Sequence, residues 1–464
     1  MRNNLFSSGC VTTLIGLSIA AASLVGHAQT VKVLYNFGSK TGDPQKPLYS
    51  GIIAQGRDGN LYSTAQQGGA GGGGAAFRIT PTGMEMVLHN FDGNDGIPWS
   101  GLTLGPDGWL YGTTEGGTTG GGTVFKLSEK GGNPTVLHGL NGSDEEGVSQ
   151  APPICAADGN FYGTTFGLFG QDGTVYKVTP SGKFTTLHTF HNTDGKNSSS
   201  PLVQGTDGNF YGTTVLGGAN FLGVVFKITP AGTYTVLHSF DGTNGSEPWS
   251  GLIQASDENF YGTTYTGGAT NSGVIFKMTP AGKFAVLHSM NGTTDGAYPF
   301  AALVEATDGN FYGANSDVAT AGAGTGTLFR ITPTGHFKAL YTFSGNRHGE
   351  PFITLVQHTN GKFYGETEFG GTANAGKFYS LDVGLKPFVA LVSSSGKVGK
   401  SIGILGQGFK GTTSVSFNGT AATFKVSSDT YLTAMVPPGA ISGRVIVVTS
   451  GGKLTSNKVF RVTP

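Results

Sequence analysis

Hydrophobic and polar residues alternate along most of the chain with a period of two, in short runs that are separated by turn residues. This alternation is typical of β-strands, whereas a helix would show a period near 3.6 residues. In one representative stretch it predicts strands over 252–255, 259–264, 274–279 and 284–290. Asp-Gly and Thr-Pro-x-Gly turns lie between such strands, because glycine accepts the positive φ of a tight hairpin and proline presets φ for a turn. We therefore expect an all-β chain of short antiparallel hairpins.

The pattern repeats along the chain. The segment LIQASDENFYGTT at 252–264 recurs as LVQGTDGNFYGTT at 202–214 and as LVEATDGNFYGAN at 303–315. Its tyrosine recurs seven times, at intervals of 49 to 52 residues: Tyr62, Tyr111, Tyr162, Tyr211, Tyr261, Tyr312 and Tyr364. Four short strands in a unit of about fifty residues are typical of one propeller blade.

The two ends of the repeat array complement one another. The first unit opens with a lone strand, VKVLYNF at 31–37, and the last unit ends after GKFYSLD at 376–382 without a strand of that type. If the N-terminal strand completes the last blade, the ring closes and no sheet edge is left exposed. We predict a seven-bladed β-propeller of four-stranded blades over residues 29–384. An open β-solenoid is the structural alternative.

Composition and the N-terminus indicate an exported protein. Charged residues make up 12% of the chain and cancel to a net charge of zero, so nucleic acid and anionic membrane surfaces are not expected partners. Residues 1–28 combine Arg2, an apolar stretch and small residues before Ala28, which predicts a secretory signal peptide and a secreted or cell-surface location. No other segment is long and apolar enough to predict a membrane span. Cys155, alone after cleavage, is expected to be a small buried hydrophobe.

Short motifs in the units carry a family resemblance. GTT-x-x-GG and G-x-VFK-x-TP-x-G resemble the GloVer extracellular repeat of bacterial choice-of-anchor proteins, over residues 33 to about 384. The resemblance implies an extracellular location and brings no catalytic residues with it.

A second resemblance covers residues 385–464, where the repeat stops. The GxGF motif at 406–409, the VSFNG segment at 415–419 and the VPPG turn at 436–439 resemble an IPT/TIG domain. This implies an immunoglobulin-like β-sandwich, for which a spacer, adhesion or docking role is expected in an exported chain without net charge.

Ligand-binding candidates come from the long, irregular connections, which we expect on one face of the ring, the loop face. Just before the inner strand of five units stands an aromatic residue: Tyr49, Trp99, Trp249, Phe300 and Phe352. Such rings could encircle the channel mouth and contact a glycan or peptide. Packing between blades is the alternative interpretation.

Candidates for chemistry are residues that break the repeat, because one reaction centre cannot have sevenfold symmetry. Glu366 and Glu368 stand where GTT becomes GETE, and their spacing in a strand would place two carboxylates about 7 Å apart, compatible with glycoside cleavage. Two glutamates in this spacing are also typical of a solvated strand face. The repeated histidines are distributed one per unit, so we expect a structural role in hydrogen bonding between blades, and no metal or cofactor is predicted.

These observations favour a secreted or surface protein that binds a glycan or protein ligand without catalysis. An extracellular polysaccharide lyase or glycosidase on a propeller scaffold is one alternative. A structural component of a surface layer is another, and the oligomeric state stays open.

Overall fold

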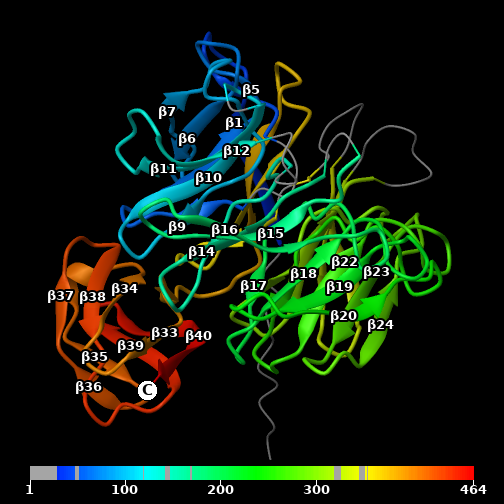
Figure 1. Cartoon of the computed structure of the whole chain (residues 1–464). Helices are drawn as coiled ribbons and strands as arrows, with labels where there is room; N and C mark the ends of the chain where they lie inside the picture. The colour runs from blue at the N-terminus through cyan, green and yellow to red at the C-terminus, as the bar shows by residue number, and fades with distance from the viewer. Residues whose placement is uncertain are drawn as a thin grey trace, which may run out of the picture.

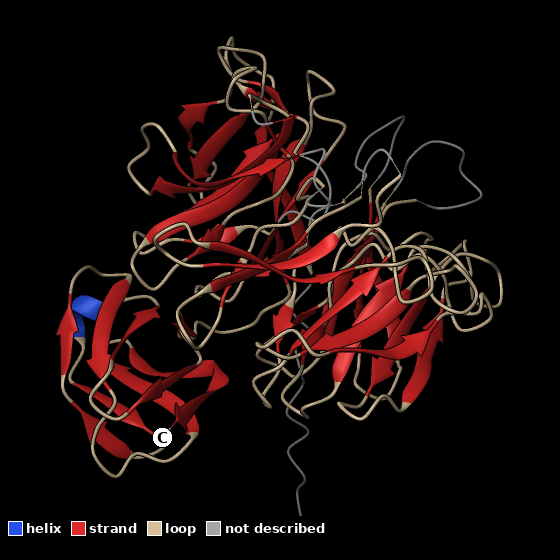
Figure 2. Ribbon diagram, viewed as in Figure 1, coloured by secondary structure: helices blue, strands red, loops and turns tan. Residues whose placement is uncertain are grey.

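The computed structural model describes residues 29–47, 52–118, 120–141, 147–167, 170–317, 326–343, 351–352 and 354–463. Within these ranges, the only helical element is a short 3₁₀ turn, η1 (Phe409–Gly411), and all other regular elements are strands (Figures 1 and 2). None of the described segments is a helix that could cross a membrane. The all-β prediction is confirmed. Residues 1–28, with the expected signal peptide, lie outside the described part.

The repeat region folds into a series of antiparallel sheets. In each sheet a two-residue strand, which we call the inner strand, leads into the strand that contains the recurring tyrosine. The sheets are numbered 1 to 7 in the order of these inner strands along the chain. Sheet 1 contains β3 (Ala54–Gln55), β4 (Leu61–Ala65), β6 (Ala75–Ile79) and β7 (Glu85–Asn90). Sheet 2 contains β9 (Thr103–Leu104), β10 (Trp109–Glu115), β11 (Gly120–Ser128) and β12 (Thr135–Asn141), with β8 (Ile97–Pro98) also paired to β10. Sheet 3 contains β13 (Ile154–Cys155), β14 (Phe161–Thr164), β15 (Thr174–Val178) and β16 (Phe184–Thr189).

The next three sheets repeat this layout. Sheet 4 contains β17 (Val203–Gln204), β18 (Phe210–Thr214), β19 (Val224–Ile228) and β20 (Tyr234–Ser239). Sheet 5 contains β21 (Ile253–Gln254), β22 (Phe260–Thr264), β23 (Val274–Met278) and β24 (Phe284–Ser289). Sheet 6 contains β25 (Val304–Glu305), β26 (Phe311–Asn315), β27 (Thr327–Ile331) and β28 (Phe337–Thr342).

Sheet 7 joins the two ends of the array. It contains β29 (Val356–Gln357), β30 (Phe363–Thr367), β31 (Lys377–Asp382) and the N-terminal strand β1 (Thr30–Asn36). β1 pairs antiparallel with β31, from Thr30 opposite Asp382 to Asn36 opposite Lys377. A small two-stranded sheet, β2 (Pro44–Gln45) with β5 (Gln67–Gly68), follows the β1 segment. The first strand of the repeat region thus supplies the outer strand of its last sheet, as the sequence predicts.

Apolar clusters lie between the sheets. Each cluster in the repeat region contains buried residues of two neighbouring sheets. One of them joins sheet 7 to sheet 1, where Tyr364 and Phe378 share a cluster with Leu61 and Phe77. Because burial of apolar area drives folding, each sheet is stabilised mainly by its neighbours.

The tyrosine that marks each unit contacts the next sheet through its ring and its own Asp-Gly turn through its hydroxyl. Tyr211 stacks on Phe260 of the next sheet, with ring centroids 4.0 Å apart, and donates its hydroxyl to Asp207 of its own Asp-Gly turn at 2.8 Å. Similar ring contacts join Tyr111 to Phe161 and Tyr162 to Phe210. The recurring Asp-Gly-Asn-Phe-Tyr motif is therefore explained by packing and turn geometry.

The inner strands are shorter than predicted. In sheet 5 only Ile253 and Gln254 pair with the neighbouring strand, opposite Tyr261 and Phe260, where the pattern had predicted residues 252–255. The tight turn that follows accounts for the early end, because Ala255 already bonds across it to Asn259.

The C-terminal domain is a sandwich of two sheets. One contains β32 (Ala390–Leu391), β34 (Ser401–Leu405), β38 (Tyr431–Met435) and β37 (Phe424–Val426). The other contains β33 (Ser395–Lys397), β40 (Gly452–Thr463), β39 (Gly443–Thr449), β35 (Ser414–Phe417) and β36 (Thr420–Ala422). Its own apolar core includes Phe409, Phe417 and Phe460. Figure 1 shows this domain, in orange and red, beside β9 and β17 of the repeat region.

Candidate ligand-binding face

The inner strands have two ends, which differ in what surrounds them. At one end are the Asp-Gly turns, which we call the turn end; at the other are the long connections of the loop face. The C-terminal domain contacts the turn end. Thr430 donates its hydroxyl to the Arg57 carbonyl at 2.7 Å, and the Arg57 guanidinium lies over the Tyr431 ring, 4.9 Å from its centroid. On sheets 4 and 5, Arg461 bonds to the Thr206 carbonyl and pairs with Glu258 at 3.2 Å.

Glu258 departs from the repeat, and its ion pair with Arg461 accounts for the departure. It occupies the left-handed turn position, with φ of 65°, where Gly59, Gly208 and Gly309 stand in other units. A glutamate is strained there, because its Cβ crowds the backbone. The ion pair with Arg461 links this strained position to the C-terminal domain.

A row of side chains joins the sheets at the turn end. The last residue of an inner strand accepts a hydrogen bond from the turn of the preceding sheet, as Gln254 does from the Thr206 N–H at 2.8 Å. Gln55 of sheet 1 accepts the equivalent bond from the Thr359 N–H of sheet 7 at 3.0 Å. Sequence reasoning missed this row, although the LVQ and LIQ motifs carried its signal.

Thr359 is the point where the first sheet, the last sheet and the C-terminal domain meet. Its hydroxyl accepts hydrogen bonds from the Gln55 amide at 2.8 Å and from the Gln407 amide at 2.9 Å, and it lies 3.4 Å from the Gly406 carbonyl. Its carbonyl accepts the Phe388 N–H at 3.1 Å. Thr359 is fully buried, and we call this group the seam node.

On the loop face, the structure brings together three of the five predicted aromatic residues. The Trp249 and Phe300 ring centroids lie 5.3 Å apart, and those of Phe300 and Phe352 lie 5.2 Å apart. Trp99 is half-buried at the equivalent position of its unit, and Tyr49 lies outside the described residues.

Phe166 is a further member of this group that the sequence did not reveal. It stands after β14, at a different repeat position, and its ring centroid lies 6.3 Å from that of Trp249. The intervening sheet contributes the small residue Ser199, whose hydroxyl reaches the Trp249 carbonyl. The Trp249 ring plane is within 18° of that of Phe166 and 23° of that of Phe300, so the three rings are nearly parallel. We call Phe166, Trp249, Phe300 and Phe352 the aromatic group.

The backbone before the aromatic group is held in an uncommon conformation. Glu247 and Tyr298, each two residues before an aromatic position, have φ of 55° and 59°. Their N–H groups bond to the Leu222 and Ser272 carbonyls, respectively, at 3.0 and 2.9 Å. Left-handed residues other than glycine persist only where their surroundings hold them, which makes this segment a rigid support for the rings.

The two glutamates proposed for chemistry are shielded. Glu366 is 0% exposed and accepts a hydrogen bond from the Ser63 hydroxyl at 3.1 Å, while Glu368 is 7% exposed. Burial raises the pKa of Glu366 to about 8, so the group is largely protonated at neutral pH. The spacing of the two glutamates had suggested a solvated strand face. In the structure the Glu366 side chain instead faces sheet 1, where it bonds to Ser63.

The repeated histidines lie between sheets, and one part of their prediction was wrong. His188 stacks on Tyr234 and His238 on Phe284 of the next sheet, with centroids 3.9 and 3.8 Å apart. The hydrogen bond of His188 goes to Asp194, at 3.2 Å, in the connection between sheets 3 and 4, where expectation had placed a bond to the next sheet itself. Ring stacking provides the contact across sheets. Among the described residues, no group of three or more His, Cys, Asp or Glu could hold a metal ion.

Cys155, in β13, is half-buried, and burial raises the pKa of its thiol to about 11. Because the thiolate is the nucleophile, we expect the folded chain lacking residues 1–28 to react with iodoacetamide at pH 7.5 at least about tenfold more slowly than the same chain in guanidinium chloride. Mass spectrometry of timed samples measures both rates. Equal rates in the two samples would contradict the burial of this thiol.

These features define an all-β protein in which mostly four-stranded sheets form the repeat region and a sandwich domain contacts their turn end. The chain belongs to the Gloeobacter/Verrucomicrobia repeat family, which matches residues 22–166 and 116–325, and an IPT/TIG domain matches residues 387–462. The two resemblances drawn from the sequence are confirmed. No curated protein matches the chain.

Solved structures resemble the chain at low identity. A fungal alcohol oxidase in complex with copper is 15% identical, with 90% of this chain and 98% of that chain covered and a TM-score of 0.52. Hydrazine synthase of Kuenenia stuttgartiensis is 12% identical, with 74% and 98% covered and a TM-score of 0.47. A putative gluconolactonase is 11% identical, with 78% and 94% covered and a TM-score of 0.40. At such identities the likeness to the alcohol oxidase concerns the fold alone.

Proposed function

We propose that sheets 1 to 7 are the blades of one closed seven-bladed β-propeller, spanning residues 29–384, and that residues 385–464 form an immunoglobulin-like cap on its turn end. The apolar cluster shared by sheets 7 and 1 supports closure, as does the bond from Thr359 to Gln55, which repeats the bond between other neighbours. Closure removes the open edges that two terminal sheets would otherwise expose.

We further propose that the protein is a secreted or cell-surface binding protein without catalysis, exported by residues 1–28, and that its ligand binds on the loop face. One observation carries this proposal: the C-terminal domain contacts the turn end, while the aromatic group lies at the opposite end of the inner strands. The burial of Glu366 and Glu368 supports this proposal, because this carboxylate pair could not reach a polysaccharide.

The arrangement of the rings favours a protein or peptide ligand over a glycan. A sugar ring packs on an open aromatic face, but Trp249 is stacked against Phe300, and Phe300 itself is only 5% exposed. A ligand therefore finds little open ring face in this group, and ring edges, which carry partial positive charge, suit peptide carbonyls and apolar side chains. Aromatic residues of this kind are frequent binding hot spots.

Arrays of peptides and glycans, incubated with the chain lacking residues 1–28, test the proposal. We expect peptide binding, and we expect Trp249→Ala to weaken it at least about tenfold, because hot-spot truncation typically costs 2 kcal/mol or more. Trp109→Ala is the matched control, since Trp109 begins β10 beside the turn end and lies under Lys126. Trp99→Ala reports whether the group extends to sheet 2.

Two results would count against this function. Binding that is unchanged by Trp249→Ala would remove the aromatic group from the site. An equal loss in the Trp109 variant would point to general destabilisation. Selective binding to glycans that depends on Trp249 would keep the face and replace the ligand class.

A further inference from the structure

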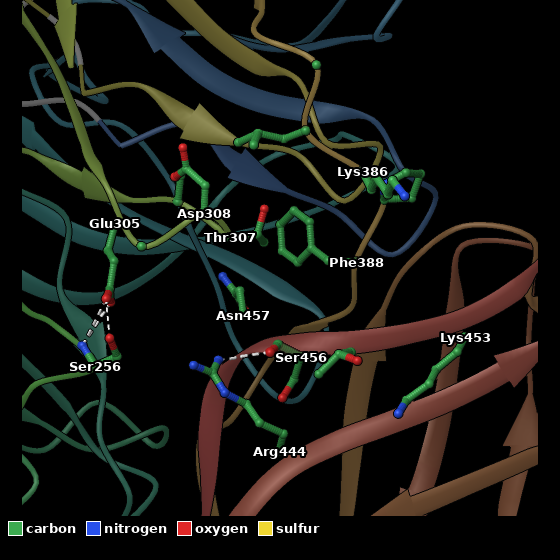
Figure 3. A pocket seen from close by; sticks show the side chains of 16 residues that line it. Ser256, Glu305, Thr307, Asp308, Lys386, Phe388, Arg444, Lys453, Ser456 and Asn457 are labelled. Carbon is green, nitrogen blue, oxygen red and sulfur yellow. Dashed lines mark hydrogen bonds between the residues drawn. The ribbon is translucent and has the colours of Figure 1, made fainter. Parts of the chain in front are cut away.

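A cavity of about 520 Å³ lies where the C-terminal domain, the connecting segment 384–388 and the turns of sheets 5 and 6 meet (Figure 3). Figure 3 shows Glu305, Thr307 and Asp308 on the repeat side and Arg444, Ser456 and Lys453 on the strands of the C-terminal domain. The volume falls within the range of about 300–1,000 Å³ that is usual for small-molecule sites. The cavity is at the turn end and is separate from the aromatic group.

The acidic groups of this cavity are already used. The Glu305 carboxylate accepts hydrogen bonds from both the N–H and the hydroxyl of Ser256. The Asp308 carboxylate accepts the Tyr312 hydroxyl at 3.0 Å and the Asn310 amide at 2.8 Å. Their oxygens serve the contact between sheets 5 and 6 and the turn of sheet 6.

The basic side chains that line this cavity make fewer contacts than its two carboxylates. Lys386 and Lys453 are exposed, and Arg444 is half-buried with one N–H bonded to the Ser456 carbonyl at 2.9 Å. Within the described ranges, no ion pair joins any of these three side chains to a carboxylate. Cations that border one cavity and keep free donors attract an anion.

The rest of the lining suits a saccharide. Pro387 and Leu385 supply apolar surface, and Thr307, Thr455 and Asn457 supply hydroxyl and amide groups around it. This mixture of an apolar surface with scattered polar groups matches the ring faces and hydroxyls of a sugar. We infer that the cavity between the two domains binds a carboxylate-bearing saccharide of about disaccharide size, with Lys386, Arg444 and Lys453 facing the carboxylates.

Calorimetric titration of the whole chain lacking residues 1–28 tests this site. The probe is the disaccharide of galacturonic acid, and its dimethyl ester is the neutral counterpart. We expect a dissociation constant below about 1 mM for the acid and at least about tenfold weaker binding of the ester. The double variant Lys386→Gln with Lys453→Gln is expected to weaken binding of the acid at least about tenfold as well. Both lysines are exposed, so the variant should fold normally, which its melting temperature checks.

The matched control is Lys410→Gln with Lys425→Gln, which removes two cations of the same domain that do not line the cavity. Its affinity for the acid should be unchanged. Equal binding of acid and ester, no binding of the acid, or an equal loss in the control variant would overturn the inference. Full displacement of the acid by sulfate at matched ionic strength would overturn the saccharide assignment. None of these results depends on the loop face, which the Trp249 experiment tests separately.

Discussion

Replacing Thr359 with valine is expected to lower the free energy of unfolding by about 2–4 kcal/mol, because valine has nearly the same shape but cannot accept a hydrogen bond. The Gln55 amide would lose its acceptor in a buried place, and the half-buried Gln407 amide would lose the same acceptor. Unsatisfied polar groups of this kind are costly when water cannot reach them. Urea denaturation, followed by fluorescence and by calorimetric melting, measures the change.

Thr307 provides the matched control for this variant. It occupies the same repeat position in sheet 6, and its hydroxyl accepts the Gln357 amide at 3.1 Å, but it is exposed. Water can replace the lost bond there, so Thr307→Val should cost less than about 1 kcal/mol. If the two variants lose equal stability, the seam node is no more important than any other junction between sheets.

The second large effect is a pH dependence that comes from Glu366. Burial raises the pKa of this carboxyl from 4.5 to about 8 in the folded chain. Between these two values the unfolded chain has released the proton and the folded chain keeps it, so the free energy of unfolding falls as pH rises. We expect this group alone to remove on the order of a few kcal/mol between pH 4.5 and 8.

Glu366→Gln should flatten that decline, because glutamine keeps the shape and cannot lose a proton. Melting temperatures measured from pH 4.5 to 8.5 give the comparison, and Glu247→Gln, at a half-buried position on the loop face, is the control. Some slope should remain, because burial also raises the pKa of Glu85, to about 7. Parallel curves for the wild type and Glu366→Gln would show that Glu366 is ionised in the folded chain.

Much of the fold could be predicted because its determinants are local. Alternation with period two, Asp-Gly turns and the recurring tyrosine all act within one unit, and each unit repeats the same signal. The pairing of β1 with β31 could also be predicted, since one end of the array had a strand that the other end lacked. The strand limits were less accurate, because the turns shorten the inner strands to two residues.

The candidate sites depended on contacts between units. The repeat register identified Trp249, Phe300 and Phe352, but Phe166 belongs to another register and reaches Trp249 only past Ser199. Glu366 stood out in the sequence as a departure from the repeat, yet the alternation could not tell whether its face met water or the next sheet. In the sequence, Thr359 resembles the other turn threonines, and only its contacts with the C-terminal domain distinguish it.

The sequence by itself determined the all-β class, the repeating unit and the sandwich domain after residue 384, because each of these follows from short-range patterning and recurring motifs. The tertiary structure decided what each repeat position contacts. Burial of Glu366, the stacking of Trp249 on Phe300 and the contact of the C-terminal domain with the turn end all arise from residues far apart in the chain. Equivalent residues in a repeat have equivalent local structure, but their chemistry differs wherever another sheet or domain packs against them.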